Sequence, residues 1–169
     1  MSPDMPDLAV SRSLPGDIPA WLRLAEEVEP EFGAAMTSDS GWIEALEAHI
    51  ARGTALCARV ATDDTMLGGM WLEMKKHSVE ISWLAVFVEH RRQGAGRALV
   101  DTAIARGGEL RVEVVTFGQS HPMVDAATAA RQLYTAAGFT RAEHVPPAGP
   151  DGTSRIALVR EPQTPSRHS

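Results

Sequence analysis

Several residue types are scarce in this sequence, and each shortage narrows the class of protein. The single cysteine, Cys57, lies in the apolar run ALCARV and cannot form a disulfide within the chain. No apolar run approaches the roughly 20 residues that a membrane-spanning helix needs. No histidine or cysteine cluster has the spacing of metal ligands, so no metal site is expected. The N-terminus MSPDMPDLAV lacks the basic and apolar regions of a signal peptide, so a cytoplasmic protein without a membrane partner is expected.

Positive charge is also in short supply. The chain has 16 lysines and arginines against 22 aspartates and glutamates, a net charge of −6, so no nucleic-acid partner is expected. Its 169 residues, 44% of them apolar, fit one ordinary domain. We expect that domain to span residues 1–160, followed by a disordered tail over 161–169. The acidic run EEVEPE, Glu26 to Glu31, is interpreted as a solvated helix end.

Hydrophobic periodicity predicts an α/β fold with a mixed sheet. Period-two patterns and turn residues predict strands at residues 8–14, 55–61, 66–74, 79–88, 110–117, from 139 onward and at 154–159. Helical spacing predicts helices from about 17 to 33, 38 to 53, 94 to 107 and 124 to 137. The predicted order is β-α-α-β-β-β-α-β-α-β-β, with helices on both faces of the sheet. The four tryptophans fit core packing better than an aromatic cage.

Positive charge gathers in one place, EHRRQGAGRAL, residues 89–99, directly after the apolar run ISWLAVFV. A strand, a glycine-rich turn and a helix in succession favour anion binding, because a helix N-terminus has unpaired amides and glycine lets an anion approach. A Walker loop would need Gly-Lys-Ser/Thr where Gly96 is followed by Arg97. A Rossmann turn would need a third glycine or alanine at Leu99. The remaining pattern, Arg-x-x-Gly-x-Gly, occurs by chance in roughly one chain in six of this size, so a solvated basic turn is the alternative.

A second pattern, LYTAAGF at residues 133–139, makes the first more specific. With both in this order, the stretch from about Val79 to Phe139 resembles the GNAT superfamily of acetyl-coenzyme A-dependent N-acetyltransferases. The resemblance implies a GNAT fold with splayed fourth and fifth strands, and direct transfer of an acetyl group from acetyl-CoA to a primary amine. That amine would belong to a small molecule or a peptide. Transfer of a longer acyl group and a CoA-binding sensor without turnover are the alternatives, and a homodimer is an option because dimers are frequent in the family.

The resemblance also implies which residues contact the cofactor. Backbone groups of the fourth strand would bind the pantetheine arm and the thioester carbonyl, and amides from Arg92 to Arg97 would bind the pyrophosphate, with the side chains of Arg91, Arg92 and Arg97 available to its charge. The expected cofactor contacts are Leu84, Ala85, Val86, Arg91, Arg92, Gln93, Gly94, Ala95, Gly96 and Arg97. Tyr134, the one tyrosine of the chain, would give a proton to the departing thiolate. Ala127 stands where many members have a cofactor-contacting asparagine.

The residue that takes the amine proton stays open at the level of sequence. Glu80 matches the glutamate of the family's histone acetyltransferase branch, but it lies roughly 13 Å along the strand from Leu84 and would act through water. Glu113 on the adjacent predicted strand is an alternative. His121, in the loop GQSHPMVD, is a further candidate, because a histidine side chain can receive a proton near physiological pH. A loop histidine before a proline is, however, more often simply exposed to solvent. Solvent could also receive the proton.

Overall fold

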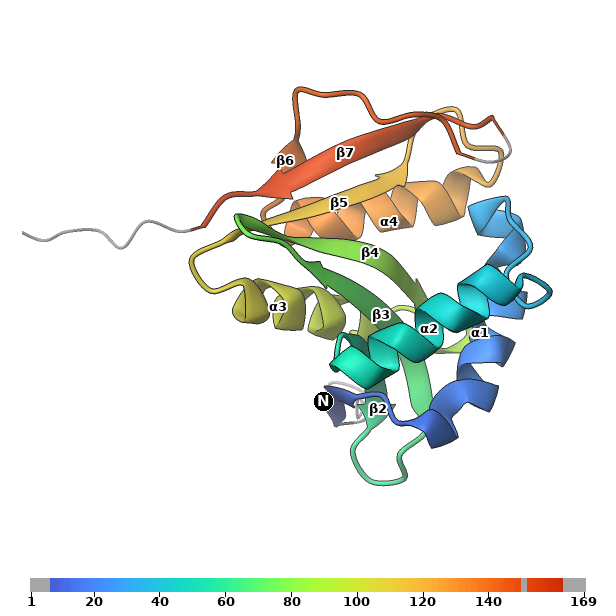
Figure 1. The fold of residues 1–169 in the computed structure, drawn as a ribbon. Helices are drawn as coiled ribbons and strands as arrows, with labels where there is room; N and C mark the ends of the chain where they lie inside the picture. Colours follow the sequence, from blue (N-terminus) through green and yellow to red (C-terminus); the bar gives the residue numbers. More distant parts are fainter. Residues whose placement is uncertain (1–6, 150–151, 163–169) are drawn as a thin grey trace, which may run out of the picture.

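The computed structural model describes residues 7–149 and 152–162 (Figure 1). The strands are β1 (Leu8–Arg12), β2 (Ala55–Val60), β3 (Met66–Met74), β4 (Ser78–Val86), β5 (Arg111–Phe117), β6 (Thr140–Arg141) and β7 (Arg155–Arg160). The α-helices are α1 (Ile18–Phe32), α2 (Ser40–Arg52), α3 (Ala95–Gly107) and α4 (Val124–Ala136). Two 3-10 helices, η1 (Pro15–Asp17) and η2 (Val88–His90), precede α1 and follow β4. The predicted disordered tail lies outside the described residues from residue 163 onward.

The strands form one mixed sheet, in the order β1-β2-β3-β4-β5-β7-β6. Its neighbouring strands are antiparallel except for the central pair, β4 and β5, which run parallel. Helices α1 and α2 cover one face of this sheet, and α3 and α4 cover the other (Figure 1). The predicted mixed α/β fold and its order of elements are therefore confirmed.

The parallel pair is joined along only part of its length. Four residue pairs connect β4 to β5, and the last joins Ile81 to Val114. Beyond it, β4 continues to Val86 and β5 to Phe117 without pairing to each other. The predicted splay of the fourth and fifth strands is thus present, and it opens the centre of the sheet.

A β-bulge in β4 lies at the start of this opening. On β3, Trp71 is paired with Trp83 and the next residue, Leu72, is paired with Ile81, so Ser82 is left over. One extra residue reverses the alternation of side chains between the two faces. Ile81 therefore packs in the core against α3 and α4, whereas Trp83 packs in the core against α1 and α2.

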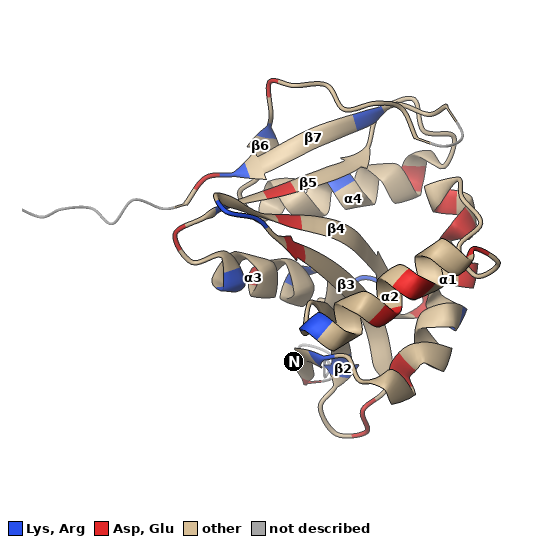
Figure 2. Ribbon diagram, in the orientation of Figure 1, with Lys and Arg blue, Asp and Glu red and all other residues tan. Residues whose placement is uncertain are grey.

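Each face of the sheet has its own apolar core. The α3 and α4 side buries, among others, Leu72, Val79, Leu99, Val100, Val112 and Tyr134. The α1 and α2 side buries Trp21, Leu24, Val28, Leu46, Trp71 and Trp83. The indole of Trp21 lies directly over Gly69 of β3, where a Cβ atom would come within 2.4 Å of the ring. Several of the chain's acidic residues lie on α1 and α2 (Figure 2).

Candidate active site

The separation of β4 from β5 opens a cavity of about 1430 Å³. Its walls include Ala95 and Tyr134 from the core against α3 and α4, and Phe32 and Trp83 from the core against α1 and α2. A cavity lined from both cores passes through the sheet. Since sites for a single small molecule usually measure roughly 300–1,000 Å³, this one has room for two ligands. The expected cofactor contacts on β4, namely Leu84, Ala85 and Val86, all line it.

The open edge of β4 offers hydrogen-bonding groups to this cavity. In an antiparallel ladder, alternate residues turn their N–H and C=O groups away from the partner strand. Beyond Ile81 the groups that β4 turns away from β3 no longer meet β5. Buried backbone groups require partners, so this edge suits an extended molecule that takes the place of a strand.

The loop between β4 and α3 presents a run of free amides at one end of the cavity. Arg92 and Gly94 have positive φ angles of 66° and 89°, which turn the backbone before α3 begins. The first helical hydrogen bond runs from the amide of Ala98 to the carbonyl of Gly94. Among the described residues, none of the six amides from Arg92 to Arg97 donates to a protein acceptor. Together with the partial positive charge of the helix N-terminus, they form a cradle for an anion.

The side chain of Arg91 does not extend into that cradle. Its Nη2 donates to both carboxylate oxygens of Glu31, at 2.8 and 3.0 Å, and its Nε donates to the carbonyl of Val86 at 3.2 Å. Glu31 is 8% exposed, so the interpretation of its run as a solvated helix end is wrong at this residue. The ion pair ties the end of α1 to the end of β4.

Arg97 is also occupied by the protein. Its Nε donates to Asp101 at 2.9 Å and its Nη1 to the carbonyl of Ala136 at 3.1 Å. Within the described part of the chain, Arg92 alone of the three expected arginines has a guanidinium without a protein partner. The expectation that all three side chains are available to a pyrophosphate is thus corrected for Arg91 and Arg97, whose charge is already balanced.

Tyr134 lines the cavity from α4. It is 4% exposed and its ring meets Phe139 edge-on, with centroids 5.5 Å apart. Its hydroxyl has no hydrogen-bond partner in the described residues. Burial raises the pKa of this phenol above its ordinary value, so the proton stays on the oxygen at neutral pH. The group can therefore act as a proton donor and not as a base.

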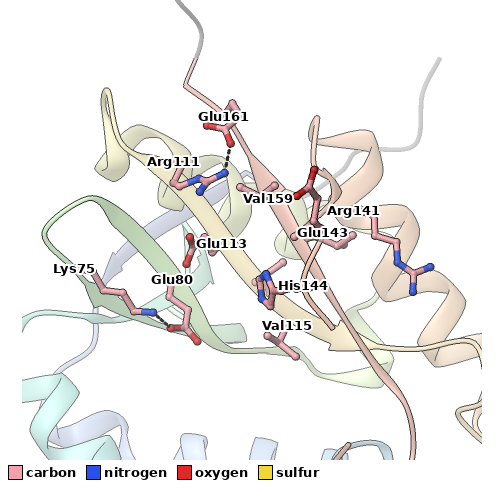
Figure 3. A pocket seen from close by; sticks show the side chains of 14 residues that line it. Lys75, Glu80, Arg111, Glu113, Val115, Arg141, Glu143, His144, Val159 and Glu161 are labelled. Atoms are coloured by element: carbon pink, nitrogen blue, oxygen red, sulfur yellow. Dashed lines mark hydrogen bonds and ion pairs between the residues drawn. The ribbon is translucent and has the colours of Figure 1, made fainter. Parts of the chain in front are cut away.

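Glu80 borders a second cavity, of about 610 Å³, on the face of α1 and α2 (Figure 3). Its carboxylate forms an ion pair with Lys75 Nζ at 2.6 Å, and it lies opposite Glu113 in the parallel ladder. The two cavities adjoin, because both are lined by Val114 and Val115. Glu80 does not line the larger cavity, so it would reach a reacting amine through water.

His121 is buried, contrary to the expectation of an exposed loop residue. It is 2% exposed, its Nδ1 accepts from the amide of Met123 at 3.0 Å, and its Nε2 lies 2.6 Å from the carbonyl of Glu31. The amide of Met123 occupies the lone pair of Nδ1, and Nε2 faces a carbonyl oxygen, so neither ring nitrogen is available to a substrate. His121 therefore holds its loop against α1 and is removed from the candidate bases.

An aromatic wall on the α1 and α2 side was not predicted. The ring of Phe32 stacks on Trp83 at 5.4 Å and meets Phe117 edge-on at 5.5 Å, while Trp42 lies 5.7 Å from Trp83. All four line the larger cavity, and Arg155 of β7 joins them. The five residues come from α1, α2, β4, β5 and β7, so no local spacing in the sequence connects them.

Residues 7–149 and 152–162 contain neither a cluster of metal ligands nor a helix that could span a membrane. No group of three histidines, cysteines, aspartates or glutamates is placed there to hold a metal ion. In the same residues, no helix combines the length and the apolar character needed to cross a membrane.

A mixed α/β sheet opened between two parallel strands, with a run of free amides at one end of the opening, is an arrangement suited to an extended anionic ligand. Residues 20–139 match the model of the Acetyltransferase (GNAT) family, and the chain belongs to that family. Mycothiol acetyltransferase of Clavibacter sepedonicus is 31% identical over 143 residues, which are 85% of this chain and 43% of that protein. The chain thus spans less than half the length of this relative.

Solved structures show the same fold. A GNAT-family acetyltransferase from Bacillus cereus ATCC 10987 superposes with a TM-score of 0.71 at 13% identity, covering 94% of this chain and 99% of that one. Diaminobutyrate acetyltransferase from Paenibacillus lautus, in complex with L-2,4-diaminobutyric acid and coenzyme A, gives a TM-score of 0.69 at 17% identity. That match covers 93% of this chain and 96% of the other.

Proposed function

We propose that this protein transfers an acetyl group from acetyl-CoA directly to a primary amine of a small molecule or peptide. The observation that carries the proposal is the cavity through the sheet with six free amides, from Arg92 to Arg97, at one end. The pyrophosphate of the donor would bind these amides and Arg92. The pantetheine arm would lie along the open edge of β4, at Leu84 to Val86, and the acceptor would enter from the side of α1 and α2.

The chain's own groups would then support the transfer. The amine nitrogen attacks the thioester carbonyl, and a free amide of β4 stabilises the negative charge that develops on its oxygen. The carbon–sulfur bond breaks, and Tyr134 donates its proton to the departing sulfur. The phenol recovers a proton from solvent. Because burial raises the pKa of Tyr134, the hydroxyl carries its proton at neutral pH and can hydrogen-bond to the departing sulfur.

The proton of the amine would leave on the other side. We assign its removal to Glu80, through water, because Glu80 faces the cavity that adjoins the reaction centre. Lys75 holds the carboxylate in place and, in return, has its own pKa raised by the hydrogen bond to Glu80. The expected single domain and cytoplasmic location stay predictions, and the homodimer stays an option.

The test is release of free thiol from acetyl-CoA over a panel of amines, polyamines, aminoglycosides, amino acids and peptides. Acceptor-dependent release is expected from at least one class. If CoA binds, as measured by calorimetry, but no acceptor causes thiol release, the result would instead support a CoA-binding sensor without turnover. Absence of CoA binding would rule out both the transferase and the sensor. Donors with longer acyl chains, run in parallel, determine whether acetyl is the preferred group.

A further inference from the structure

One guanidinium on the α1 and α2 side of the cavity, where the acceptor would enter, has no carboxylate partner among the described residues. Arg155 opens β7, pairs in register with Phe117 at the end of β5, and lines the cavity. The next residue, Ile156, packs on the core against α3 and α4. Because successive strand residues face opposite sides, Arg155 lies on the face of α1 and α2, beside the aromatic wall.

The side chain of Arg155 is held in place with most of its donors unused. An arginine offers five N–H donors. In Arg155, Nη2 donates a hydrogen bond to the carbonyl of Phe32 at 3.4 Å. Its Nε is buried and has no partner in the described residues. Gly149 packs against the guanidinium, since a Cβ atom there would lie 2.6 Å from Nε. A buried donor in a native protein normally has an acceptor, so the arrangement calls for one.

The other cations around the two cavities are accounted for. Four have carboxylate partners, namely Lys75, Arg91, Arg97 and Arg111. Figure 3 shows two of these pairs, those of Lys75 and Arg111. Arg92 belongs to the loop between β4 and α3, the donor loop, whose amides from Arg92 to Arg97 would bind the pyrophosphate. Arg141 is exposed and points away from Glu113 (Figure 3). Within the described chain, Arg155 is thus the cation left to recognise an acceptor.

A second unpaired donor lies on the same side of the cavity. Nε1 of Trp42 is buried, has no partner among the described residues, and belongs to a residue that lines the cavity. Both unpaired buried groups on the wall are donors, so they suit a ligand rich in acceptor oxygens. We infer that the amine acceptor carries an anionic oxygen group, a carboxylate or a phosphate, which the planar fork of Arg155 binds. This inference rests on the proposed transferase function.

The experiment compares acceptors that differ only in the anion. Lysine is paired with cadaverine, dialanine with dialanine amide, and glucosamine 6-phosphate with glucosamine, and kcat/KM is measured from thiol release. The first two pairs test a carboxylate and the third tests a phosphate. In the wild-type protein at least one anionic member should exceed its neutral counterpart by about ten- to hundredfold, as charged hydrogen bonds in a site provide.

Variants separate recognition from a purely structural role. Arg155→Gln should bring the ratio of kcat/KM for the anionic acceptor to that for the neutral acceptor close to one. Arg155→Lys keeps the positive charge without the planar guanidinium and should retain part of the preference for the anionic acceptor. Arg23→Gln removes an exposed arginine of α1 and should leave the ratio unchanged. A structural contact from β7 to α1 would lower activity on both members of a pair equally, so an unchanged ratio in Arg155→Gln overturns the inference.

The outcomes also distinguish the two proposals. Turnover of amines with no preference for the anionic member of any pair contradicts the role of Arg155 and leaves the transferase function standing. Absence of thiol release from every acceptor contradicts the transferase function, and the inference fails with it. Binding of CoA, measured in each variant, should be equal to that of the wild type, because Arg155 lies on the opposite face from the donor loop.

Discussion

Tyr134 combines a buried ring, a raised pKa and a hydroxyl that has no partner in the described residues and borders a cavity. Each property alone is compatible with a core residue. A structural tyrosine, however, usually pairs its hydroxyl when it is buried. The three together favour a proton donor that meets its partner only when the cavity is filled.

Tyr134→Phe removes that hydroxyl and little else. We expect kcat to fall by roughly 10²–10⁴-fold, the range of a general acid, with the affinity for CoA unchanged. The free energy of unfolding should stay within about 0.5 kcal/mol, because the lost group makes no hydrogen bond in the described structure. Steady-state kinetics, calorimetry with CoA and urea unfolding measure the three quantities. An unaltered kcat would remove Tyr134 from the mechanism.

Glu80 and Glu113 provide a matched pair for the proton acceptor, because they face each other across the parallel ladder. If Glu80 takes the amine proton, Glu80→Gln should lower kcat/KM at least about tenfold near neutral pH, and the loss should shrink as rising pH deprotonates the amine. Glu113→Gln should stay within roughly twofold of the wild type. Equal activity of all three proteins would assign the proton to solvent.

The site could be predicted from sequence where it is local. Gly94 and Gly96 follow a strand and open a helix, and those three signals are adjacent in the chain. Glu31 and His121 could not be placed in the same way, because their burial depends on contacts with each other's segments, 90 residues apart. Arg155 carries no signal, since its neighbours in space come from other elements.

At the level of elements, α3 has a glycine with positive φ at each end, Gly94 at 89° and Gly108 at 58°. Gly94 lies within the run of free amides, while Gly108 lies at the far end of α3, with no atom within 4 Å of a Cβ built there. A Cβ at Gly94 would meet only Leu8, at an ordinary 3.6 Å. Either alanine variant therefore tests backbone strain with little steric overlap.

Gly94→Ala and Gly108→Ala should each lower the free energy of unfolding by about 1–2 kcal/mol, the cost of a side chain at positive φ. The affinity for CoA should separate them. Gly94→Ala displaces the amide cradle and should raise the Kd at least about tenfold, equivalent to 1.4 kcal/mol. Gly108→Ala should leave the Kd unchanged. Equal Kd values would show that the loop does not bind the donor.

The helices and strands were predictable because the spacing of apolar residues and the glycines and prolines between them are local signals. The β-bulge in β4 was not predictable from such signals. Ser82 lies within ISWLAVFV, where nothing marks the change of face, and the register shift is decided by the pairing of β3 with β4. The strand expected from Phe139 is only two residues long, because β6 pairs with β7 through Thr140 and Arg141 alone.

The stability of the whole molecule depends in part on the contact between α2 and the sheet, where His49 of α2 is buried against β3. His49 is 3% exposed, stacks on Trp71 at 4.9 Å, accepts or donates at Thr54, 2.7 Å away, and lies 3.1 Å from Glu73. Desolvation lowers its pKa below the ordinary value and outweighs the opposing effect of Glu73; Arg52 lowers it further. The folded state therefore prefers the neutral ring.

Protonation of His49 makes the stability of the fold depend on pH. The unfolded chain binds a proton at His49 more readily than the folded protein, so stability is fully present above the ordinary histidine pKa and falls as pH drops below it. Urea unfolding at about pH 7.5 and about pH 5.5 should show this loss, and His49→Gln should reduce it. His77→Gln, which changes an exposed histidine, should retain it. An identical loss in His49→Gln would place the effect elsewhere.

The cavity through the sheet bears on the order in which the two substrates of the proposed reaction would bind. Because the donor loop and the aromatic wall lie on opposite faces, the two substrates of the proposed transfer would each have an entrance, and neither would have to pass the other's position. Either could arrive first, and the acetylated product could depart before or after the spent thiol. Initial-rate plots should therefore intersect, and each product should inhibit competitively against its own parent substrate.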